Sequence, residues 1–178
     1  MVKVVKGITA EWGICSRTVI LDDIPLDLAY CNNTVAVGLI SGGIILLDAT
    51  TGSQLAILSK HTNWARSLTF SLGGMFLVSG SYDKTVLLWD MQTSGVIKSF
   101  CGHTDWIESD SISVDSTIIA SGSNDRTICL WDIQTGGCCC VIDVYKHVSS
   151  VNFSPTNSQL LISACKDNTI QQWDISGC

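Results

Sequence analysis

Glutamate is scarce in this 178-residue chain, and no apolar run is long enough to span a membrane. Only Glu11 and Glu108 are glutamates among the 16 acidic residues, and the rest are aspartates, which favour turns over helices. The hydrophobic fraction is 46%, but the apolar runs have only the length of strands, far below the roughly 18 residues of a membrane helix. The N-terminus also lacks the sustained apolar core of a secretory signal. The composition therefore argues against helices, a transmembrane span and a membrane partner.

The sequence also lacks a cluster of basic residues and a paired-cysteine motif. Its ten basic residues are scattered and its formal net charge is −6, so nucleic-acid binding is not expected. The nine cysteines include no CxxC pair, although Cys138, Cys139 and Cys140 are consecutive. His147 and Cys165 do not have the spacing of zinc ligands either. Reduced, structural thiols in the cytoplasm are favoured over a redox or metal role, and neither a metal site nor a cofactor is predicted.

The chain contains four related copies of one sequence segment. The copy Ser79–Asp90, SGSYDKTVLLWD, is nearly repeated at Ser121–Asp132 as SGSNDRTICLWD. Weaker copies end at Asp48 and at Asp174, so successive closing aspartates are 42 residues apart. A fixed period of about 40 to 45 residues is typical of propeller blades.

Four short β segments fall within each of the first three repeats, separated by turns rich in Asn, Ser and Gly. The fourth repeat has only the first three. The sequence therefore predicts an all-β fold of four propeller blades, each a four-stranded antiparallel sheet, in a ring that is partial or completed by another chain. The expected boundaries are a lead-in strand at residues 1–21 and repeats at residues 22–60, 61–102, 103–144 and 145–178.

Both ends of the repeat array are incomplete. The β segment from Trp12 to Leu21 has no blade of its own, and the fourth repeat has no outer strand after Trp173. A lead-in strand that completes the last blade would close a ring and remove its edges. Three arrangements remain open: closure by this chain alone, pairing of two chains through Trp12 to Leu21 into eight blades, or a fragment of a longer ring.

The pattern GH...SGS.D.T..LWD resembles the WD-repeat family. The residues that carry it are Gly102, His103, Ser121, Gly122, Ser123, Asp125, Thr127, Leu130, Trp131 and Asp132. The match is specific in the second and third repeats and weaker in the first. More narrowly, the segments EWGICSRTV and IILLDATTGSQLA are similar to the repeat regions of fungal NACHT and WD-repeat proteins, which are intracellular receptors of the STAND class. The GxxxxGK phosphate loop of such a receptor is absent from this sequence.

Two sets of His, Ser and Asp have the residue types of a hydrolase triad at identical spacings. A catalytic set is normally unique in a domain and no GxSxG elbow is present, so the duplication favours a structural role and no catalytic residue is predicted. The WD-repeat resemblance implies instead that the turn Asp, the His, the Ser and the Trp form one hydrogen-bonded chain. The residues at these positions are His61, Ser79, Asp83 and Trp89, then His103, Ser121, Asp125 and Trp131, and finally Ser163, Asp167 and Trp173 in a fourth repeat without the His.

Asp110 departs from the repeat, because alignment places it in the slot filled by Leu68 on the innermost strand of the preceding repeat. An unpaired buried carboxylate is so costly that it tends to protonate. Asp110 is therefore expected either to face a water-filled central channel or to mark a locally weakened blade.

The resemblance also implies that a protein partner docks on the face carrying the loops before the innermost strands and the turns between the second and third strands. Trp64 and Trp106 stand at equivalent points there, with Arg66 nearby, which is the composition of an interface hot spot. The alternative is that each indole packs on its blade. The predicted partner-binding residues are Thr62, Trp64, Tyr82, Thr104, Trp106, Asn124, His147 and Lys166.

The predicted function is a non-catalytic scaffold for protein interaction and, on the narrower resemblance, the ligand-sensing repeat region of a NACHT-type receptor. One alternative is a self-assembling structural module, favoured by the incomplete ends. Another is an enzyme with the propeller as scaffold, for which only Asp110 with Glu108 breaks the repeat as a polar cluster.

Overall fold

The computed structural model describes residues 3–6, 9–10, 13–14 and 17–177, and every regular element in these residues is a β-strand. The predicted all-β fold is therefore confirmed. No helix in this part of the chain is long and apolar enough to cross a membrane. The strands are β1 (Lys3–Lys6), β2 (Thr9–Ala10), β3 (Gly13–Ile14), β4 (Arg17–Ile20), β5 (Pro25–Cys31), β6 (Thr34–Leu39), β7 (Ile44–Asp48), β8 (Gln54–Leu58), β9 (Ala65–Phe70), β10 (Phe76–Ser81), β11 (Thr85–Asp90), β12 (Gly95–Cys101), β13 (Ile107–Ile112), β14 (Ile118–Ser123), β15 (Thr127–Asp132), β16 (Cys138–Asp143), β17 (Val148–Phe153), β18 (Leu160–Cys165) and β19 (Ile170–Asp174).

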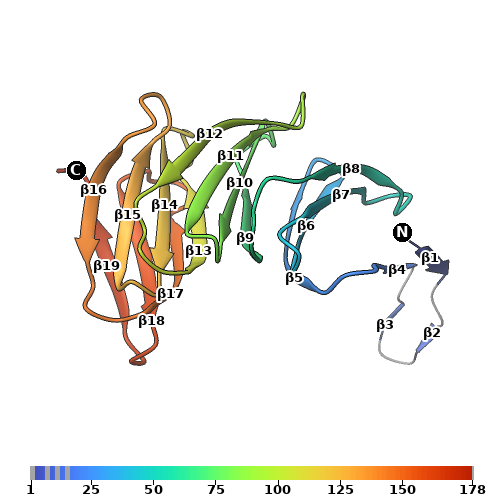
Figure 1. Cartoon of the computed structure of the whole chain (residues 1–178), viewed down its shortest axis with the longest axis horizontal. Coiled ribbons are helices and arrows are strands. Elements are labelled where there is room, and N and C mark those ends of the chain that lie inside the picture. Colours follow the sequence, from blue (N-terminus) through green and yellow to red (C-terminus); the bar gives the residue numbers. More distant parts are fainter. Residues whose placement is uncertain (1–2, 7–8, 11–12, 15–16, 178) are drawn as a thin grey trace.

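Four antiparallel sheets form the body of the molecule, and in each the strands follow one another in chain order (Figure 1). Blade 1 is β5 to β8, blade 2 is β9 to β12, blade 3 is β13 to β16, and blade 4 is β17 to β19. The first strands β5, β9, β13 and β17 lie side by side as the innermost strands. The closing aspartate of each repeat ends the third strand and caps the next turn; Asp90 Oδ1, for example, accepts from Gln92 N at 2.7 Å.

The blades pack face to face because alternate residues of a strand point to opposite sides of its sheet. In β10, Leu77 packs toward blade 1 and Val78 toward blade 3, and both side chains are fully buried. Blade 3 directs Ala120 and Ile128 toward blade 4 in the same way. Each blade therefore has two apolar faces, and blades 2 and 3 bury both of them.

Neighbouring innermost strands are also tied together by side-chain hydrogen bonds to the backbone. Three of these ties recur at equivalent positions: Asp27 Oδ2 with Leu68 N at 2.8 Å, Ser67 Oγ with Asp110 N at 2.8 Å, and Ser109 Oγ with Val151 N at 3.1 Å. The sheet register places the three acceptors at one repeat position and the three donors at the next. Each tie holds one blade against its neighbour near the centre of the arc.

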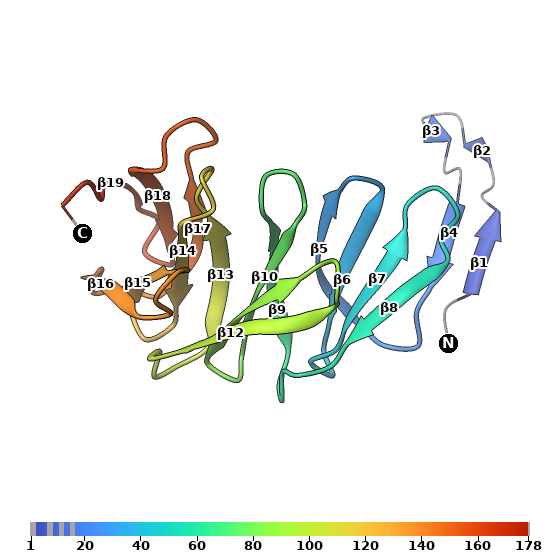
Figure 2. The same cartoon turned by 90° about the horizontal axis from the view of Figure 1, so that it is seen from above.

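The four blades form an open arc, with β16 and β19 at one end and β4 and β1 at the other (Figure 2). The lead-in strand β4 pairs with β1 and not with β19. Closure of the ring by the chain's own first strand, one of the three arrangements that the sequence left open, is therefore not found in the described residues. Trp12 lies outside those residues. Val19 and Leu21 instead pack on blade 1, against Ile45 and Leu47.

Candidate partner-binding face

A chain of hydrogen bonds inside blade 2 holds the loop before β9 to the turn between β10 and β11. Trp89 Nε1 donates to Ser79 Oγ at 2.8 Å, and the same oxygen lies 2.8 Å from His61 Nε2. His61 Nδ1 lies 2.8 Å from Asp83 Oδ2. Because a carboxylate only accepts and an indole NH only donates, a neutral imidazole that donates from Nδ1 satisfies every member. The structure thus brings together the four residues that the sequence places in this network.

Blade 3 contains the same chain with nearly identical distances. Trp131 Nε1 donates to Ser121 Oγ at 2.8 Å, and His103 Nε2 lies 2.7 Å from that oxygen. His103 Nδ1 lies 2.7 Å from Asp125 Oδ2. Both serines of blades 2 and 3 are fully buried, so the network pairs polar atoms that would otherwise be costly to bury.

The network is reduced in blade 4 and replaced in blade 1. In blade 4, Trp173 Nε1 still donates to Ser163 Oγ at 2.9 Å, while the side chain of Asp167 bonds within its own turn. In blade 1, the register places Val37 and Leu47 where the Ser and the Trp stand in blade 2. These apolar residues form a cluster instead, which removes the donors and acceptors together and leaves no member of the set unpaired.

The network keeps its turn aspartates ionised. Burial by itself raises the pKa of Asp83, but the hydrogen bonds from His61 and Thr85 outweigh it and hold the pKa well below its ordinary range. The pKa of Asp125 is lowered in the same way in blade 3. Asp83 Oδ2 also accepts from Thr62 N at 3.0 Å, so the carboxylate fixes the backbone of the loop before β9.

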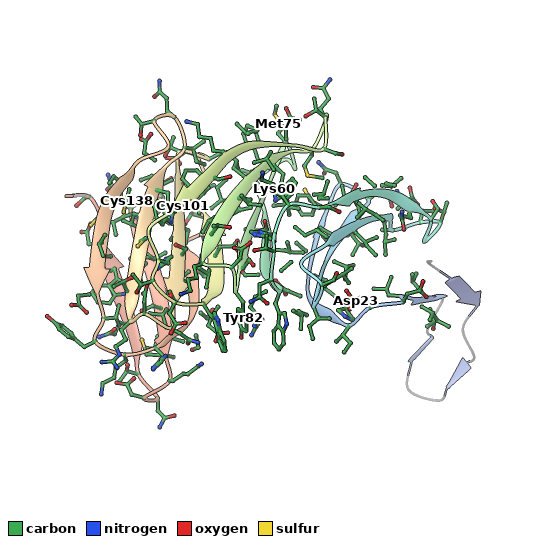
Figure 3. The ribbon with its side chains drawn as sticks, viewed as in Figure 1. Asp23, Lys60, Met75, Tyr82, Cys101 and Cys138 are labelled. Carbon is green, nitrogen blue, oxygen red and sulfur yellow. The ribbon has the colours of Figure 1, made fainter. Side chains whose placement is uncertain are left out.

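Three aromatic rings stack at the end of the blades that carries these loops and turns. The ring of Tyr82 lies between the indoles of Trp64 and Trp106, with centroid distances of 4.9 and 4.5 Å and interplanar angles of 14° and 7°. We call this end, defined by the three rings, the indole face; Tyr82 and Met75 lie at opposite ends of the sheets (Figure 3). Trp106 is 45% exposed. Sequence reasoning weighed partner contact against packing on the blade, and missed that Tyr82 joins the two indoles.

Glu108, in blade 3, contacts this stack and also binds side chains of blades 2 and 4. It lies in the β-bulge near the start of β13, and such bulges redirect a side chain out of the regular alternation. Its carboxylate accepts from Tyr82 Oη at 3.3 Å and pairs with Arg66 Nε and Lys166 Nζ, each at 3.3 Å. Burial above all, together with the charge of Glu108, raises the pKa of Tyr82, so the phenol stays protonated and continues to donate.

The other residues predicted to contact a partner divide into exposed and buried ones. Thr62, Thr104 and His147 are exposed, and the side chain of Lys166 is 52% exposed. Asn124 is buried, and its Oδ1 accepts from Lys166 Nζ at 3.2 Å. Asn124 therefore holds the ammonium group of Lys166, and its predicted contact with a partner stays a prediction.

Asp110 is buried, so the expected exposure to a water-filled channel is wrong. The register confirms its slot, because Asp110 and Leu68 each lie opposite the network serine of their blade. Asp110 is 3% exposed, and neither carboxyl oxygen has a hydrogen-bond partner among the described residues. Oδ2 points toward blade 2, where a Cβ added to Gly80 would lie 3.0 Å from it. Burial raises the pKa of Asp110 to about 7, despite the nearby hydroxyl of Ser67.

The polar pair considered as an enzymatic site is not held together. Glu108 points to the indole face with Arg66 and Lys166, whereas Asp110 is enclosed between blades 2 and 3. The expected weakening of a blade at Asp110 stays a prediction.

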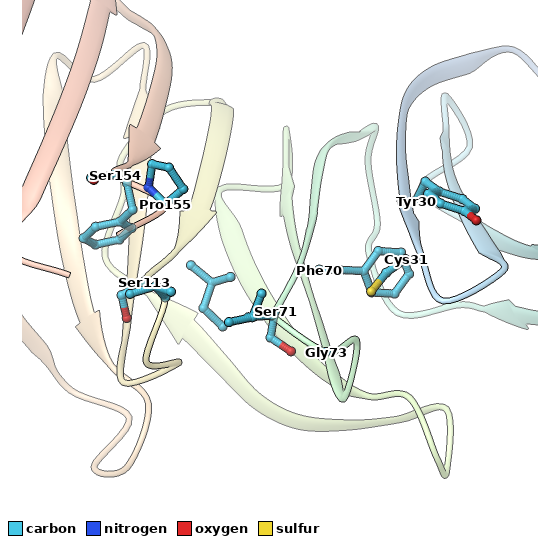
Figure 4. Close-up of a pocket in the computed structure, with 12 residues that line it drawn as sticks. Tyr30, Cys31, Phe70, Ser71, Gly73, Ser113, Ser154 and Pro155 are labelled. Carbon is cyan, nitrogen blue, oxygen red and sulfur yellow. The ribbon is translucent and has the colours of Figure 1, made fainter. Parts of the chain in front are cut away.

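A pocket of about 300 Å³ lies at the other end of the innermost strands (Figure 4). Residues from the ends of all four innermost strands line it, among them Tyr30, Phe70, Ile112 and Phe153. The hydroxyl of Ser71, also in the lining, accepts from Phe76 N at 3.0 Å and so holds the adjoining turn. The lining of the pocket is mainly apolar, and its residues come from equivalent positions in the four blades.

The cysteines are distributed over the blades. Cys31, Cys101, Cys129 and Cys165 are free thiols, and burial raises the pKa of Cys129 to about 12. In the part of the chain that the structure describes, no group of three His, Cys, Asp or Glu residues is placed to hold a metal ion.

Comparison with known families matches three segments of the chain. The family described as WD domain, G-beta repeat matches residues 52–90, 94–132 and 137–174, which together make up more than half of the sequence. Each matched segment begins with the outer strand of one blade and ends with the third strand of the next. The sequence repeat and the sheet are thus offset by one strand. No curated protein matches the chain.

Proposed function

This chain belongs to the WD-repeat family, and from that premise we propose that it is a recognition platform whose protein partner docks on the indole face. WD repeats generally serve as non-catalytic scaffolds for protein interaction. The observation that carries the proposal is the stack of Trp64, Tyr82 and Trp106 at an accessible rim of three loops.

The stack has the physical properties of a binding hot spot. Its rings are already held in place by one another and by Glu108, so a partner would immobilise few additional side chains. Trp, Tyr and Arg are the residue types enriched at such positions. The backbone of the Trp106 loop is fixed as well, because Trp106 N donates to Asp105 Oδ1 at 2.8 Å. A rigid, partly exposed indole, close in sequence to the Glu108 carboxylate and its partners Arg66 and Lys166, favours a partner that presents an apolar side chain with polar neighbours.

The test is selection of peptides followed by a single substitution. A phage library of random dodecapeptides is panned on the wild-type chain, and the enriched peptides are measured by fluorescence polarisation. We expect Trp106→Ala to weaken binding at least tenfold, since truncating a hot-spot aromatic typically costs about 2 kcal/mol or more. The far-UV spectrum should remain unchanged.

Met75→Ala is the matched control, because Met75 is 70% exposed at the opposite end of the sheets. Its peptide affinities should equal those of the wild type. Peptides that bind the wild type and Trp106→Ala equally, or a Trp106→Ala chain that does not fold, would count against the indole face as the docking site.

A narrower proposal is that this platform is the ligand-sensing region of a cytoplasmic NACHT-type receptor. It is supported by the similarity of EWGICSRTV and IILLDATTGSQLA to the repeat regions of such receptors, and by the free thiols, which suit a reducing compartment. Sequencing the transcript on both sides of the region that encodes this chain tests it: a GxxxxGK phosphate loop is expected in the same reading frame, and its absence would reject the proposal.

Self-assembly is a second candidate role, with residues Trp12 to Leu21 as the proposed point of contact. The observation that favours it is that the arc of blades is open at both ends.

A further inference from the structure

The face of blade 4 that points away from blade 3 is open and carries exposed apolar side chains beside the polar Asn152 and Gln172. The register identifies two repeat positions at which each blade packs on the next. The residues there are Val78 and Val86 in blade 2, Ala120 and Ile128 in blade 3, and Ile162 and Ile170 in blade 4. The first four are 0% exposed, whereas Ile162 is 42% and Ile170 is 78% exposed. Blade 4 thus leaves two apolar side chains of a blade contact uncovered, while Gln172 stands where the other blades have a leucine and Ala164 where they have a glycine.

Blade 1 presents the complementary surface. By register, Leu28 occupies the position of Leu68 and Val151, at which each blade packs on the one before it. Leu28 is 67% exposed, against 6% for Leu68 and 0% for Val151. Tyr30 is likewise 66% exposed, against 9% for Phe153 in blade 4. The two ends of the arc therefore carry, uncovered, apolar residues from the two sides of the contact that joins each blade to the next.

The lead-in strand already stands beside the open face of blade 1. Val19 and Leu21, in and after β4, pack on Ile45 and Leu47. Phe100, in the outer strand of blade 2, packs on blade 3 in the same manner. Strand β4 thus occupies the place of a preceding blade's outer strand, and in the described residues no fourth strand pairs with β19.

We propose that blade 4 of one chain docks on blade 1 of a second copy, beside that copy's β4, and that two such contacts close an eight-bladed ring. The proposal deepens the self-assembly candidate and is independent of peptide binding at the indole face. The contact is head to tail, because different surfaces of the two copies meet. Eight blades lie within the range that propellers adopt.

A second copy fits better than the chain's own blade 1. Blade 4 and β4 lie at opposite ends of the arc, so closure within one chain would require all three existing blade contacts to repack (Figure 2). Docking of a second copy leaves these contacts intact. It also extends the ties between innermost strands: Ser150 stands at the repeat position of Ser67 and Ser109, and its hydroxyl would accept from Leu28 N of the second copy.

The first experiment measures mass in solution by sedimentation equilibrium. We expect the wild type to have twice the 19.1 kDa of the chain. Ile170→Asp and Leu28→Asp should each yield a folded monomer, because both side chains are largely exposed within one copy. Leu72→Asp is the matched control: Leu72 is 76% exposed in the turn between β9 and β10, outside both faces, and this variant should remain dimeric.

Mixing the two monomeric variants tests the head-to-tail geometry. Ile170→Asp keeps an intact blade 1 face and Leu28→Asp keeps an intact blade 4 face, so the mixture should form a heterodimer through one contact. A monomeric wild type, a wild type that grows beyond the dimer, a dimer that survives Ile170→Asp, or a mixture that stays monomeric would each overturn the proposal. Panning the monomeric Ile170→Asp chain reports separately on the indole face.

Discussion

At the scale of the residue, Asp110 is where charge and burial conflict. The other three blades place Leu28, Leu68 and Val151 in the same slot of the innermost strand, whereas blade 3 encloses a carboxyl group there. The pKa of Asp110 is raised to about 7 from the ordinary 3.8, so the folded state prefers the protonated form. The penalty for ionisation is absent below about pH 3.8, grows as the pH rises toward 7, and is constant above that.

We therefore predict that Asp110→Val stabilises the protein, and that it does so more at high pH than at low pH. At pH 8 the gain should be on the order of a few kcal/mol, since one pKa unit corresponds to about 1.4 kcal/mol. At pH 4 the gain should be much smaller, because the native carboxyl is then neutral. Urea unfolding of both proteins across this range measures the difference. Val151 shows that valine fits the slot, so a loss of stability would mean that Asp110 has a specific partner.

At the scale of the element, the tryptophan network of blades 2 and 3 joins the third strand to the second strand and to the preceding loop. Trp89 and Trp131 are each 2% exposed and complete a network of four residues. Trp173 is only partly buried, and its blade has no histidine in the network. Removing the tryptophan side chain therefore removes more buried contact in blades 2 and 3 than in blade 4.

We predict that Trp89→Ala and Trp131→Ala each lower the free energy of unfolding by about 3 to 5 kcal/mol, through lost packing and an unpaired serine. Trp173→Ala should cost less. Tyr145→Ala is the control, because Tyr145 is an aromatic residue that is 72% exposed, and it should change stability little. Denaturant titration of the four variants gives the ranking, and equal losses for the three tryptophans would refute it.

At the scale of the whole molecule, each blade of the arc packs against the blades next to it in sequence. Every blade draws its stability from the blades beside it, and the two terminal blades each have one apolar face without such a neighbour. Covering those faces with a second copy would bury Leu28, Tyr30, Ile162 and Ile170, and folding would then be coupled to association.

This coupling predicts that thermal stability depends on protein concentration. A hundredfold increase in concentration should raise the Tm of the wild type by several degrees, because association stabilises the folded state by mass action. The Tm of Ile170→Asp should not change over the same range. Differential scanning calorimetry at two concentrations measures both values, and a concentration-independent Tm for the wild type would contradict coupled folding and association.

Much of the fold could be predicted because the information is local and repeated. The 42-residue spacing of Asp48, Asp90, Asp132 and Asp174 marks the end of each third strand, where the carboxylate caps a turn only a few residues away. The hydrogen-bond network was equally accessible, since its residue types recur at the same spacings in two blades and match one another as donors and acceptors.

The indole face was less predictable, because its key contacts join different blades. The sequence indicates Trp64 and Trp106 as equivalent positions, but the insertion of Tyr82 between them depends on how far blade 3 is rotated from blade 2. The partners of Glu108 depend in addition on a β-bulge that redirects its side chain, and this bulge recurs at the start of the innermost strand in every blade. The contact of Asn124 with Lys166 of the next blade depends on the same rotation, and the partner-binding role of Asn124 stays a prediction.

The sequence by itself determined the blade, because a blade is built from contacts within one repeat, and the repeat is visible as a period. Only the tertiary structure decided what happens between blades and at the ends of the array. In the tertiary structure, Asp110 is buried against Gly80, and the rings of Trp64, Tyr82 and Trp106 stack although they come from three loops. The arc of blades is open, and β4 packs on blade 1. The physical reason is that such contacts depend on the rotation from one sheet to the next, which side-chain packing across the whole interface sets and no single segment encodes.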